Sequence, residues 1–519
     1  MIAEILRLEP DPSRDAGLKF ILPGFVDSHI HIESSMLLPS EFARVAVRHG
    51  TVATVSDPHE IANVCGIEGV ELMLRNAATT PFKFCFGAPS CVPATTFETA
   101  GANLDAQAVS QLLDDSRIGY LSEMMDFPGV LNRSPEVMSK IEAALDRGKP
   151  VDGHAPGLRA DDAANYVSAG ITTDHECFTI EEALDKIAAG CKIAIREGSA
   201  ARNFEALQSL IDSHPDQVML CSDDKHPDEF LLGHINQLAA RAIASGRDLM
   251  NVLQVACVNP VDHYSLDVGL LRVGDPADFI VVEDLAEFKV AETYIAGQLL
   301  ARNGECLMPA AETETLNNFV AHPIEVSQLE VRAEGNQVRV IQAIEGQLIT
   351  REVIRDCCVE DGKVVADLEN DVLKIVVANR YKKAPPQVAL VTGFELNQGA
   401  LAGSVAHDSH NIVAIGTNDE DLVAAINAVI QHRGGLAVSG NGQTDVLPLP
   451  VAGLMSTESC ESVGETYGQL DCRIKEFGTP LRAPFMTLSF MALLVIPSLK
   501  ISDRGLFDGD RFEFVSLFV

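Results

Sequence analysis

Residues 23–35 have the sequence PGFVDSHIHIESS, in which an apolar run from Phe25 leads into two histidines separated by one residue. The alternation of a β-strand places His29 and His31 on the same face, so two neutral imidazoles can bind one metal ion. Chance histidines produce the H-x-H pattern often, and it carries weight only if further ligands follow along the chain. The stretch predicts a strand that ends at a candidate metal site.

Seven more short apolar runs follow this strand, and amphipathic segments separate them. Segments such as 39–50 and 134–148 have apolar residues at helical spacing, and most of these segments end in glycine. Eight strand and helix units of this length predict a closed (β/α)8 barrel of the α/β class rather than an open doubly wound sheet. The seven further predicted strands are residues 51–58, 82–90, 119–126, 150–156, 171–178, 191–198 and 217–224.

Polar side chains cluster where these predicted strands end. Taken singly, each is as well explained as a solvated loop residue. Barrel enzymes, however, build their sites from residues at the carboxyl ends of different strands, and five or six strands ending in the same way are hard to dismiss. The residues are His29, His31, Asp57, His59, Glu123, His154, His175, Glu176, Asp223 and Asp224.

Four imidazoles and two carboxylates of this group are suitable metal ligands. One hydrolytic metal with an open position needs fewer donors than six, so we infer two ions, with Glu123 as the bridging carboxylate. Asp223 suits the role of a base that accepts and relays the proton of an attacking water. The predicted ligands are His29, His31, Glu123, His154, His175 and Asp223.

The remainder of the chain predicts two smaller units beside the barrel. We expect residues 1–22 and 262–308 to form the two parts of a small β-sandwich domain, and residues 23–261 to form the barrel. Residues 309–519 mix strands, such as 374–381 and 411–417, with a helix over 419–435, which predicts a C-terminal α+β domain.

Composition excludes several classes of partner. The 519 residues include 39 Lys and Arg against 74 Asp and Glu, a formal net charge of -35, and no basic run that would neutralise a polyanion. Nucleic acid and membranes are therefore poor partners. The longest apolar stretch, 484–499, is too short for a membrane span, and we expect it in the core. Because the first residues lack a secretion signal, we expect a cytoplasmic protein with reduced thiols. The sequence leaves open whether the protein forms a homo-oligomer.

Several motifs together resemble a known family. PGFVDSHIHIESS and GLLRVGDPADFIVVED (269–284) resemble the amidohydrolase superfamily. A closer resemblance, to the adenine deaminases, extends from about Phe20 to the C-terminus. It rests on TVATVSDPHEIANV (51–64), GYLSEMMDFPGV (119–130), VDGHAPGL (151–158), ITTDHE (171–176) and above all AHDSHNIVAIGTNDEDL (406–422).

The resemblance implies a metal-dependent hydrolase barrel that deaminates free adenine to hypoxanthine and ammonia. It also implies a pair of divalent ions, manganese or iron with zinc as a further option, on the six ligands named above. The acidic composition agrees with a free base as substrate, because a polynucleotide would be repelled. Members of the family begin with further strands of the small domain, so we expect unpaired edges and exposed apolar faces around 279–301.

Other candidates have competing explanations. Asp57, His59 and Glu60 suit contact with substrate or with a ligand, or a loop that caps the next helix. Glu176 suits protonation of a purine ring nitrogen, or is a surface carboxylate. A further set suits a metal, a loop that closes the barrel mouth or a hydrogen-bonded turn. This set consists of His407, Asp408, His410 and Asn411, with Asp224 as a further substrate candidate.

Two rival functions remain at this point. Another cyclic amidohydrolase would open a ring amide such as a hydantoin or a dihydropyrimidine. Those enzymes commonly carry a carboxylated lysine as the bridge, whereas the fourth strand here offers Glu123. A non-catalytic barrel that serves as a binding or assembly subunit predicts lost ligands, and the sequence retains all six.

Overall fold

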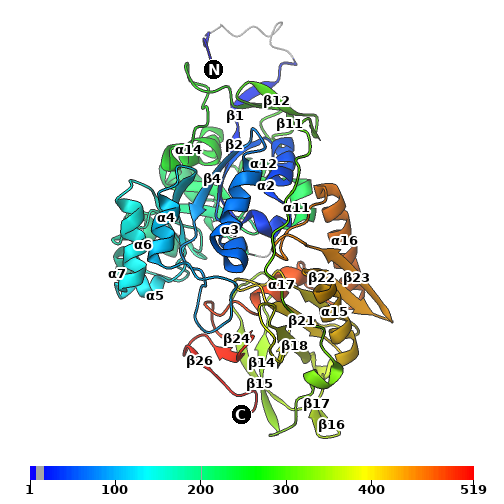
Figure 1. Ribbon diagram of the computed structural model, residues 1–519. Coiled ribbons are helices and arrows are strands. Elements are labelled where there is room, and N and C mark those ends of the chain that lie inside the picture. The colour runs from blue at the N-terminus through cyan, green and yellow to red at the C-terminus, as the bar shows by residue number, and fades with distance from the viewer. Residues whose placement is uncertain (7–16, 200) are drawn as a thin grey trace.

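The barrel forms as predicted (Figure 1). The structure is a computed structural model that describes residues 1–6, 17–199 and 201–519. All eight predicted strands are present and parallel, and their side chains are mostly buried because helices cover the outer face. The strands are β2 (Phe25–Ile30), β3 (Thr51–Ser56), β4 (Lys83–Ala88), β5 (Ile118–Met124), β6 (Val151–Gly153), β7 (Thr173–Asp174), β8 (Lys192–Arg196) and β9 (Val218–Cys221).

Two short connections close the ring of strands. Strands β2 to β6 form one hydrogen-bonded group and β7 to β9 another. At one seam, the Asp223 amide donates to the His29 carbonyl at 2.9 Å, and Ile30 bridges Asp223. At the other seam, the Thr172 amide donates to the Val151 carbonyl at 2.8 Å. The first seam joins the strand of the H-x-H motif directly to the residue predicted to act as base.

Helices surround the barrel at the positions that the apolar spacing predicts. Asp105 and Thr179 cap two of them by accepting from the backbone amides of Ala108 and Glu182. The helices are η1 (Ile32–Ser35), α2 (Pro39–Ala46), η2 (Val47–His49), α3 (His59–Ala77), α4 (Ala106–Leu113), α5 (Phe127–Leu131), α6 (Pro135–Leu145), α7 (Ala160–Val167), α8 (Ile180–Ala188), α9 (Phe204–Leu207), α10 (Leu210–Ser213), η3 (Pro215–Gln217), α11 (Pro227–Leu232), α12 (Ile235–Ala244), α13 (Leu249–Leu253), η4 (Gln254–Val258) and α14 (Asn259–Tyr264).

The small β unit is one five-stranded antiparallel sheet at the N-terminal end of the molecule (Figure 1). The expectation of exposed apolar faces around 279–301 is wrong for the inner face. Ile280 and Val282 are buried against the barrel residue Phe25, and β1 pairs with the edge of β10. The strands are β1 (Phe20–Pro23), β10 (Phe279–Val282), β11 (Val290–Ile295), β12 (Gln298–Arg302) and β13 (Glu305–Cys306).

The C-terminal part contains an eight-stranded sheet in the order β15-β14-β19-β18-β21-β20-β22-β23. The predicted helix over 419–435 is α15 (Asp419–Gln431), and α16 (Cys460–Glu476) and α17 (Pro484–Phe490) follow it. The sheet strands are β14 (Gln337–Gln342), β15 (Arg351–Asp356), β18 (Leu373–Ala378), β19 (Gln387–Thr392), β20 (Ala400–Gly403), β21 (Ile412–Gly416), β22 (Gly435–Gly440) and β23 (Gln443–Pro448).

Short elements complete this part. They are η5 (Val326–Leu329), β16 (Val359–Glu360), β17 (Lys363–Val364), η6 (Leu368–Asn370), β24 (Leu499–Ser502), β25 (Gly505–Asp508) and β26 (Glu513–Phe514). Every residue of α17 is buried, which confirms that the apolar stretch 484–499 begins in the core. In the described ranges, no helix is both long and apolar enough to cross a membrane. The boundaries at residues 22, 261 and 308 stay predictions.

Candidate active site

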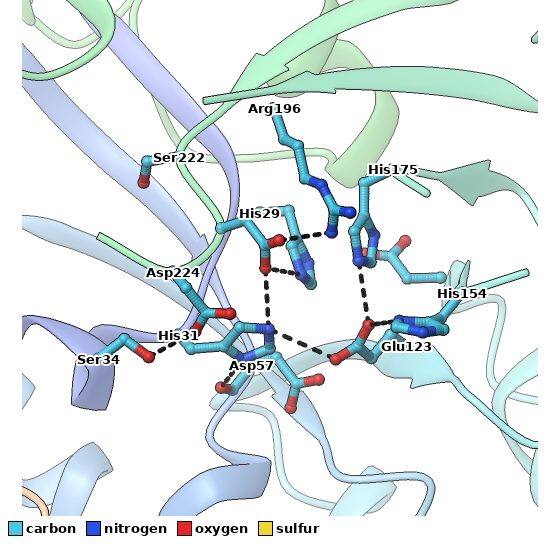
Figure 2. Close-up of polar contacts among 12 residues, drawn as sticks. His29, His31, Ser34, Asp57, Glu123, His154, His175, Arg196, Ser222 and Asp224 are labelled. Carbon is cyan, nitrogen blue, oxygen red and sulfur yellow. Dashed lines mark hydrogen bonds and ion pairs between the residues drawn. The ribbon is translucent and has the colours of Figure 1, made fainter. Parts of the chain in front are cut away.

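The six predicted metal ligands meet at the carboxyl ends of the barrel strands. Figure 2 labels all of them except Asp223. Parallel strands bring their carboxyl ends to one edge, so side chains distant in sequence converge there. Each ligand side chain is buried, although the residues are charged or polar. They lie at the ends of β2, β5, β6, β7 and β9, and are His29, His31, Glu123, His154, His175 and Asp223.

Glu123 lies at the centre of this group. One carboxylate oxygen, Oε2, lies 2.7 Å from His154 Nδ1 and 3.1 Å from His175 Nε2, and Oε1 lies 3.4 Å from His31 Nε2 (Figure 2). Burial alone would raise the pKa of the Glu123 carboxyl, but the charges and hydrogen bonds of His154 and His175 outweigh burial and hold that pKa well below its ordinary value. Glu123 is therefore an ionised carboxylate, with one oxygen near His154 and His175 and the other near His31.

Asp223, which follows β9, joins the same group. Its Oδ1 lies 3.5 Å from His29 Nε2 and 3.3 Å from His31 Nε2, while Oδ2 accepts a hydrogen bond from Arg196 at 2.7 Å. Burial opposes ionisation, but the Arg196 charge and the two histidines lower the pKa of Asp223 well below its ordinary value. Asp223 therefore has one oxygen bound to Arg196 and the other directed at the H-x-H pair.

The donor set fits divalent metal ions. Both ring nitrogens of His29 and Nε2 of His154 are buried without a hydrogen-bond partner among the described residues. A buried polar atom without a partner costs free energy, which a bound cation would offset. Imidazole and carboxylate ligands together suit manganese, iron and zinc. Ligand atoms of His29, His31 and Asp223 lie within 4.8 Å of one another, and so do those of His154, His175 and Glu176.

Arg196, at the end of β8, is a site residue that the sequence analysis missed. Its guanidinium is fully buried and contacts both oxygens of Glu176, with Nη2 donating to Oε2 at 2.8 Å, as well as Asp223. Glu176 is 1% exposed, so its interpretation as a surface carboxylate is wrong. A positive charge thus lies between two buried carboxylates. An arginine at the polar end of a strand whose neighbours end in acids is the signal that was available.

Asp57, in the loop before α3, and His59, the first residue of α3, support the ligand group. Asp57 Oδ2 lies 3.0 Å from His59 Nδ1, and the Asp57 carbonyl lies 3.2 Å from His31 Nδ1. Asp57 also accepts from the His59 amide, one of the backbone amides that the first turn of a helix leaves free, so the same carboxylate satisfies that amide and orients the ring. Asp224 is also buried there and accepts a hydrogen bond from Ser34 at 2.5 Å.

The C-terminal sheet contributes residues to the same cavity. His407 Nδ1 lies 2.5 Å from Glu60 Oε1, and His410 Nε2 contacts the other Glu60 oxygen. Asp408 Oδ1 lies 3.7 Å from His59 Nε2. These two histidines lower the pKa of Glu60 well below its ordinary value, although burial opposes the shift. The segment therefore reaches the barrel mouth.

Asn411 has a different position from its neighbours in the motif. Its amide oxygen accepts from the Arg380 backbone amide at 3.1 Å, and its Nδ2 donates to the Thr99 carbonyl at 2.9 Å. These bonds join Asn411 to backbone groups far away in the sequence and do not form a local hydrogen-bonded turn. The bond to Thr99, in the connection between β4 and α4, holds the segment of the preceding histidines against the barrel.

Barrel residues and residues of the C-terminal part line one cavity together. The charged lining residues come from the barrel, with His407 and Asp408 from the C-terminal part. The apolar lining residues come mostly from the C-terminal part, and three of them lie in the stretch 484–499 that the sequence analysis expects in the core. These apolar residues are Met125, Leu348, Phe490, Leu493 and Val495.

Comparisons with known proteins agree with this site. Residues 20–300 match the profile of the amidohydrolase family, and residues 347–513 match that of the adenine deaminase C-terminal domain. The adenine deaminase of Salinibacter ruber is 56% identical over 517 residues, covering 99% of this chain and 94% of the relative. That of Sulfurovum sp. is 55% identical over 497 residues, covering 96% and 92%. The chain belongs to the adenine deaminase family.

Solved structures resemble this member of the adenine deaminase family over little more than half of its chain. The β-aspartyl dipeptidase of Fervidobacterium islandicum is 16% identical with a TM-score of 0.44, covering 57% of this chain and 86% of the other. A D-hydantoinase from Thermus sp. is 13% identical with a TM-score of 0.42, covering 56% and 86%.

Membership of the adenine deaminase family bears on the two rival functions. The amidohydrolase family is metal-dependent, and the candidate ligand groups of this chain are intact. The non-catalytic barrel, which predicts lost ligands, is therefore not favoured. The hydantoin or dihydropyrimidine rival is not favoured either, because the relatives named adenine deaminase match nearly the full length of both chains.

We expect Arg196→Met to destabilise the metal-free protein by about 3–5 kcal/mol, because it leaves Glu176 and Asp223 buried without their cation. Arg202→Met is the matched control, since Arg202 pairs with Glu229 at a partly exposed site where the expected loss is below about 1 kcal/mol. Urea unfolding of both variants measures the difference. Equal unfolding midpoints for the two variants would contradict the role assigned to Arg196.

Proposed function

We propose that this protein catalyses the hydrolytic deamination of adenine to hypoxanthine and ammonia. The observation that carries the proposal is the convergence of four imidazoles and two carboxylates in one cavity, in a chain whose relatives named adenine deaminase match it nearly end to end. The substrate is the free base, because the strongly acidic chain would repel a polynucleotide.

The proposal includes two divalent ions, manganese or iron, with zinc as an alternative. His29, His31 and Asp223 would hold one ion, His154 and His175 the other, and Glu123 would bridge them. When bound, such ions acidify water and neutralise charge that develops on the substrate. The central position of Glu123 among His31, His154 and His175 supports its role as the bridge.

Asp223 would move the protons. It accepts a proton from the water whose oxygen attacks the ring carbon, and passes it to the exocyclic nitrogen. The new carbon–oxygen bond replaces the carbon–nitrogen bond, and the nitrogen leaves as ammonia because it has gained that proton. The second proton of the water ends on the adjacent ring nitrogen, so hypoxanthine and ammonia together account for both. Arg196 contacts Asp223 Oδ2, so Oδ1, the oxygen that faces His29 and His31, would carry this transfer.

Other residues of the cavity would bind and orient the base. Glu176, placed by Arg196, lies beside His154 and His175 and is the proposed donor to a purine ring nitrogen. Three residues of the barrel would support the ligands: Asp57, His59 and Glu60. Three further residues would contact the substrate: Asp224, His407 and Asp408.

A cytoplasmic location is part of the proposal. All twelve cysteines are free thiols in the structure, and six of them are buried. Disulfides are rare in the reducing cytoplasm, so free thiols agree with that location.

The function is tested by the absorbance change of adenine in the presence of protein reconstituted with manganese or iron. We expect stoichiometric hypoxanthine and ammonia. Hydantoin and dihydropyrimidine serve as parallel substrates. If either ring is opened while adenine is untouched, the proposed function is wrong.

We expect Glu123→Gln to bind fewer than two ions per chain, because a neutral amide cannot neutralise two cations as a shared carboxylate does. Cys177→Ser is the control. Cys177 is buried next to the site, with its sulfur 3.7 Å from Asp174, but it is not among the proposed ligands. Elemental analysis of both purified variants gives the result. Two ions in Glu123→Gln at wild-type affinity would remove Glu123 as the bridge, and loss of metal from Cys177→Ser would mean that the ligand set is wrong.

We expect Asp223→Asn to fold, to bind one ion more weakly and to turn over adenine about a hundredfold or more slowly, in line with general acid–base contributions. The loss falls mainly on kcat, because the proton transfers are completed only in the transition state. Turnover at saturating metal separates chemistry from occupancy. A near wild-type rate would refute the assignment, and Asp224 would become the next candidate.

A further inference from the structure

The apolar side of the cavity comes almost entirely from the C-terminal part of the chain. Leu348 lies in the connection between β14 and β15, Phe490 ends α17, and Leu493 and Val495 follow it. We call these four residues the roof. They line the same cavity as the charged barrel side chains, and the charged chemistry of the barrel does not account for them. A planar ligand with polar edges and apolar faces matches such an asymmetric cavity.

A buried lysine connects the segments of the roof. Lys500 on β24 is fully buried, and its Nζ donates to the Leu348 carbonyl at 2.7 Å and to the Phe490 carbonyl at 2.9 Å. No carboxylate pairs with it among the described residues. Burial of a lysine without a counter-charge costs free energy. Both hydrogen bonds of Lys500 hold the backbone of a roof residue.

Further bonds attach the same strand to both roof segments. Thr350 Oγ1 donates to the Leu499 carbonyl at 2.7 Å, and the Ile501 amide donates to the Met491 carbonyl at 3.1 Å. Burial lowers the pKa of Lys500 to about 7. A neutral amine has two N–H donors, the number of carbonyls that face it, so deprotonation leaves no donor without a partner.

The roof is also aligned with the charged wall. The ring centroids of Phe490 and His407 lie 5.2 Å apart, and His407 contacts Glu60 of the barrel at 2.5 Å. A displacement of Phe490 would therefore disturb His407, which contacts the barrel. Ring packing, as well as hydrogen bonds, therefore positions the roof relative to the barrel.

We propose that the roof grips the face of the purine ring and determines affinity for the base, and that Lys500 is a positioning residue that fixes the roof. The identity of the ring rests on the proposed function, but the grip on a planar heterocycle does not require turnover. Phe490 and Leu493 contact the ligand, whereas Lys500 acts through the Leu348 and Phe490 backbones.

Steady-state kinetics with adenine test the proposal. We expect Phe490→Ala to raise KM about tenfold to a hundredfold, the range that removal of an aromatic side chain from a stacked base produces. We expect Lys500→Met, which keeps the apolar stem but leaves two carbonyls without a donor, to raise KM about tenfold with a smaller fall in kcat. Both variants should retain the wild-type metal content.

Two control variants separate positioning from general loss of stability. Lys374→Met removes another buried lysine of the C-terminal sheet, which pairs with Asp419 at 2.7 Å and does not line the cavity. Phe485→Ala removes a buried ring of α17, the helix that ends at Phe490, and Phe485 does not line the cavity. We expect both controls to unfold more easily and to keep the wild-type KM.

Titration calorimetry with hypoxanthine, the expected product, measures the grip without turnover. Weaker binding by Phe490→Ala and Lys500→Met than by both controls supports the proposal. KM and hypoxanthine affinity within twofold of wild type in Phe490→Ala overturn the roof, even if Lys500→Met does not fold. If the wild-type protein binds hypoxanthine but does not deaminate adenine, the proposed function is contradicted, whereas the proposed role of the roof in binding is not.

Discussion

Burial of many ionisable side chains at one edge of the barrel is the constraint on which the rest of the structure depends. Isolated charges in such an environment would be neutralised or would unfold the protein. Here the carboxylates at the centre of the site have cationic or imidazole partners: Glu123 lies among three histidines, and Arg196 lies between Glu176 and Asp223. The pKa values of Glu123 and Asp223 are lowered by these partners in spite of burial. The same arrangement leaves imidazole nitrogens of His29 and His154 without partners, as a metal site requires.

Because of this constraint, the barrel does not complete the site alone. Glu60 is buried at the barrel mouth, and its two oxygens contact His407 and His410 of the C-terminal part. Once that contact is made, the apolar residues around α17 cover the cavity. Charge compensation between Glu60 and the two histidines therefore aligns the two parts of the site, and apolar packing encloses it.

Much of the barrel and its ligand set could be predicted from the sequence, because both depend on local patterns. Apolar runs at regular spacing gave eight strands, and the polar residues that follow them mark the edge where the strands end. Arg196 was missed because KIAIR (192–196) has the pattern of a buried strand, and an arginine at its polar end was the one signal in the sequence; the fold shows that this side chain lies between two acids. The roof was missed for a related reason, since apolar residues that line a cavity have the same composition as core residues. The contact between Glu60 and His407 joins residues 347 positions apart, and only the folded chain shows it.

The most direct test of the account is anomalous diffraction from crystals of the manganese-loaded protein, recorded on both sides of the manganese absorption edge. The account predicts two anomalous peaks at the carboxyl ends of the strands, both in contact with Glu123, one beside His29 and His31 and the other beside His154 and His175. A single peak, or peaks that do not contact Glu123, would contradict it.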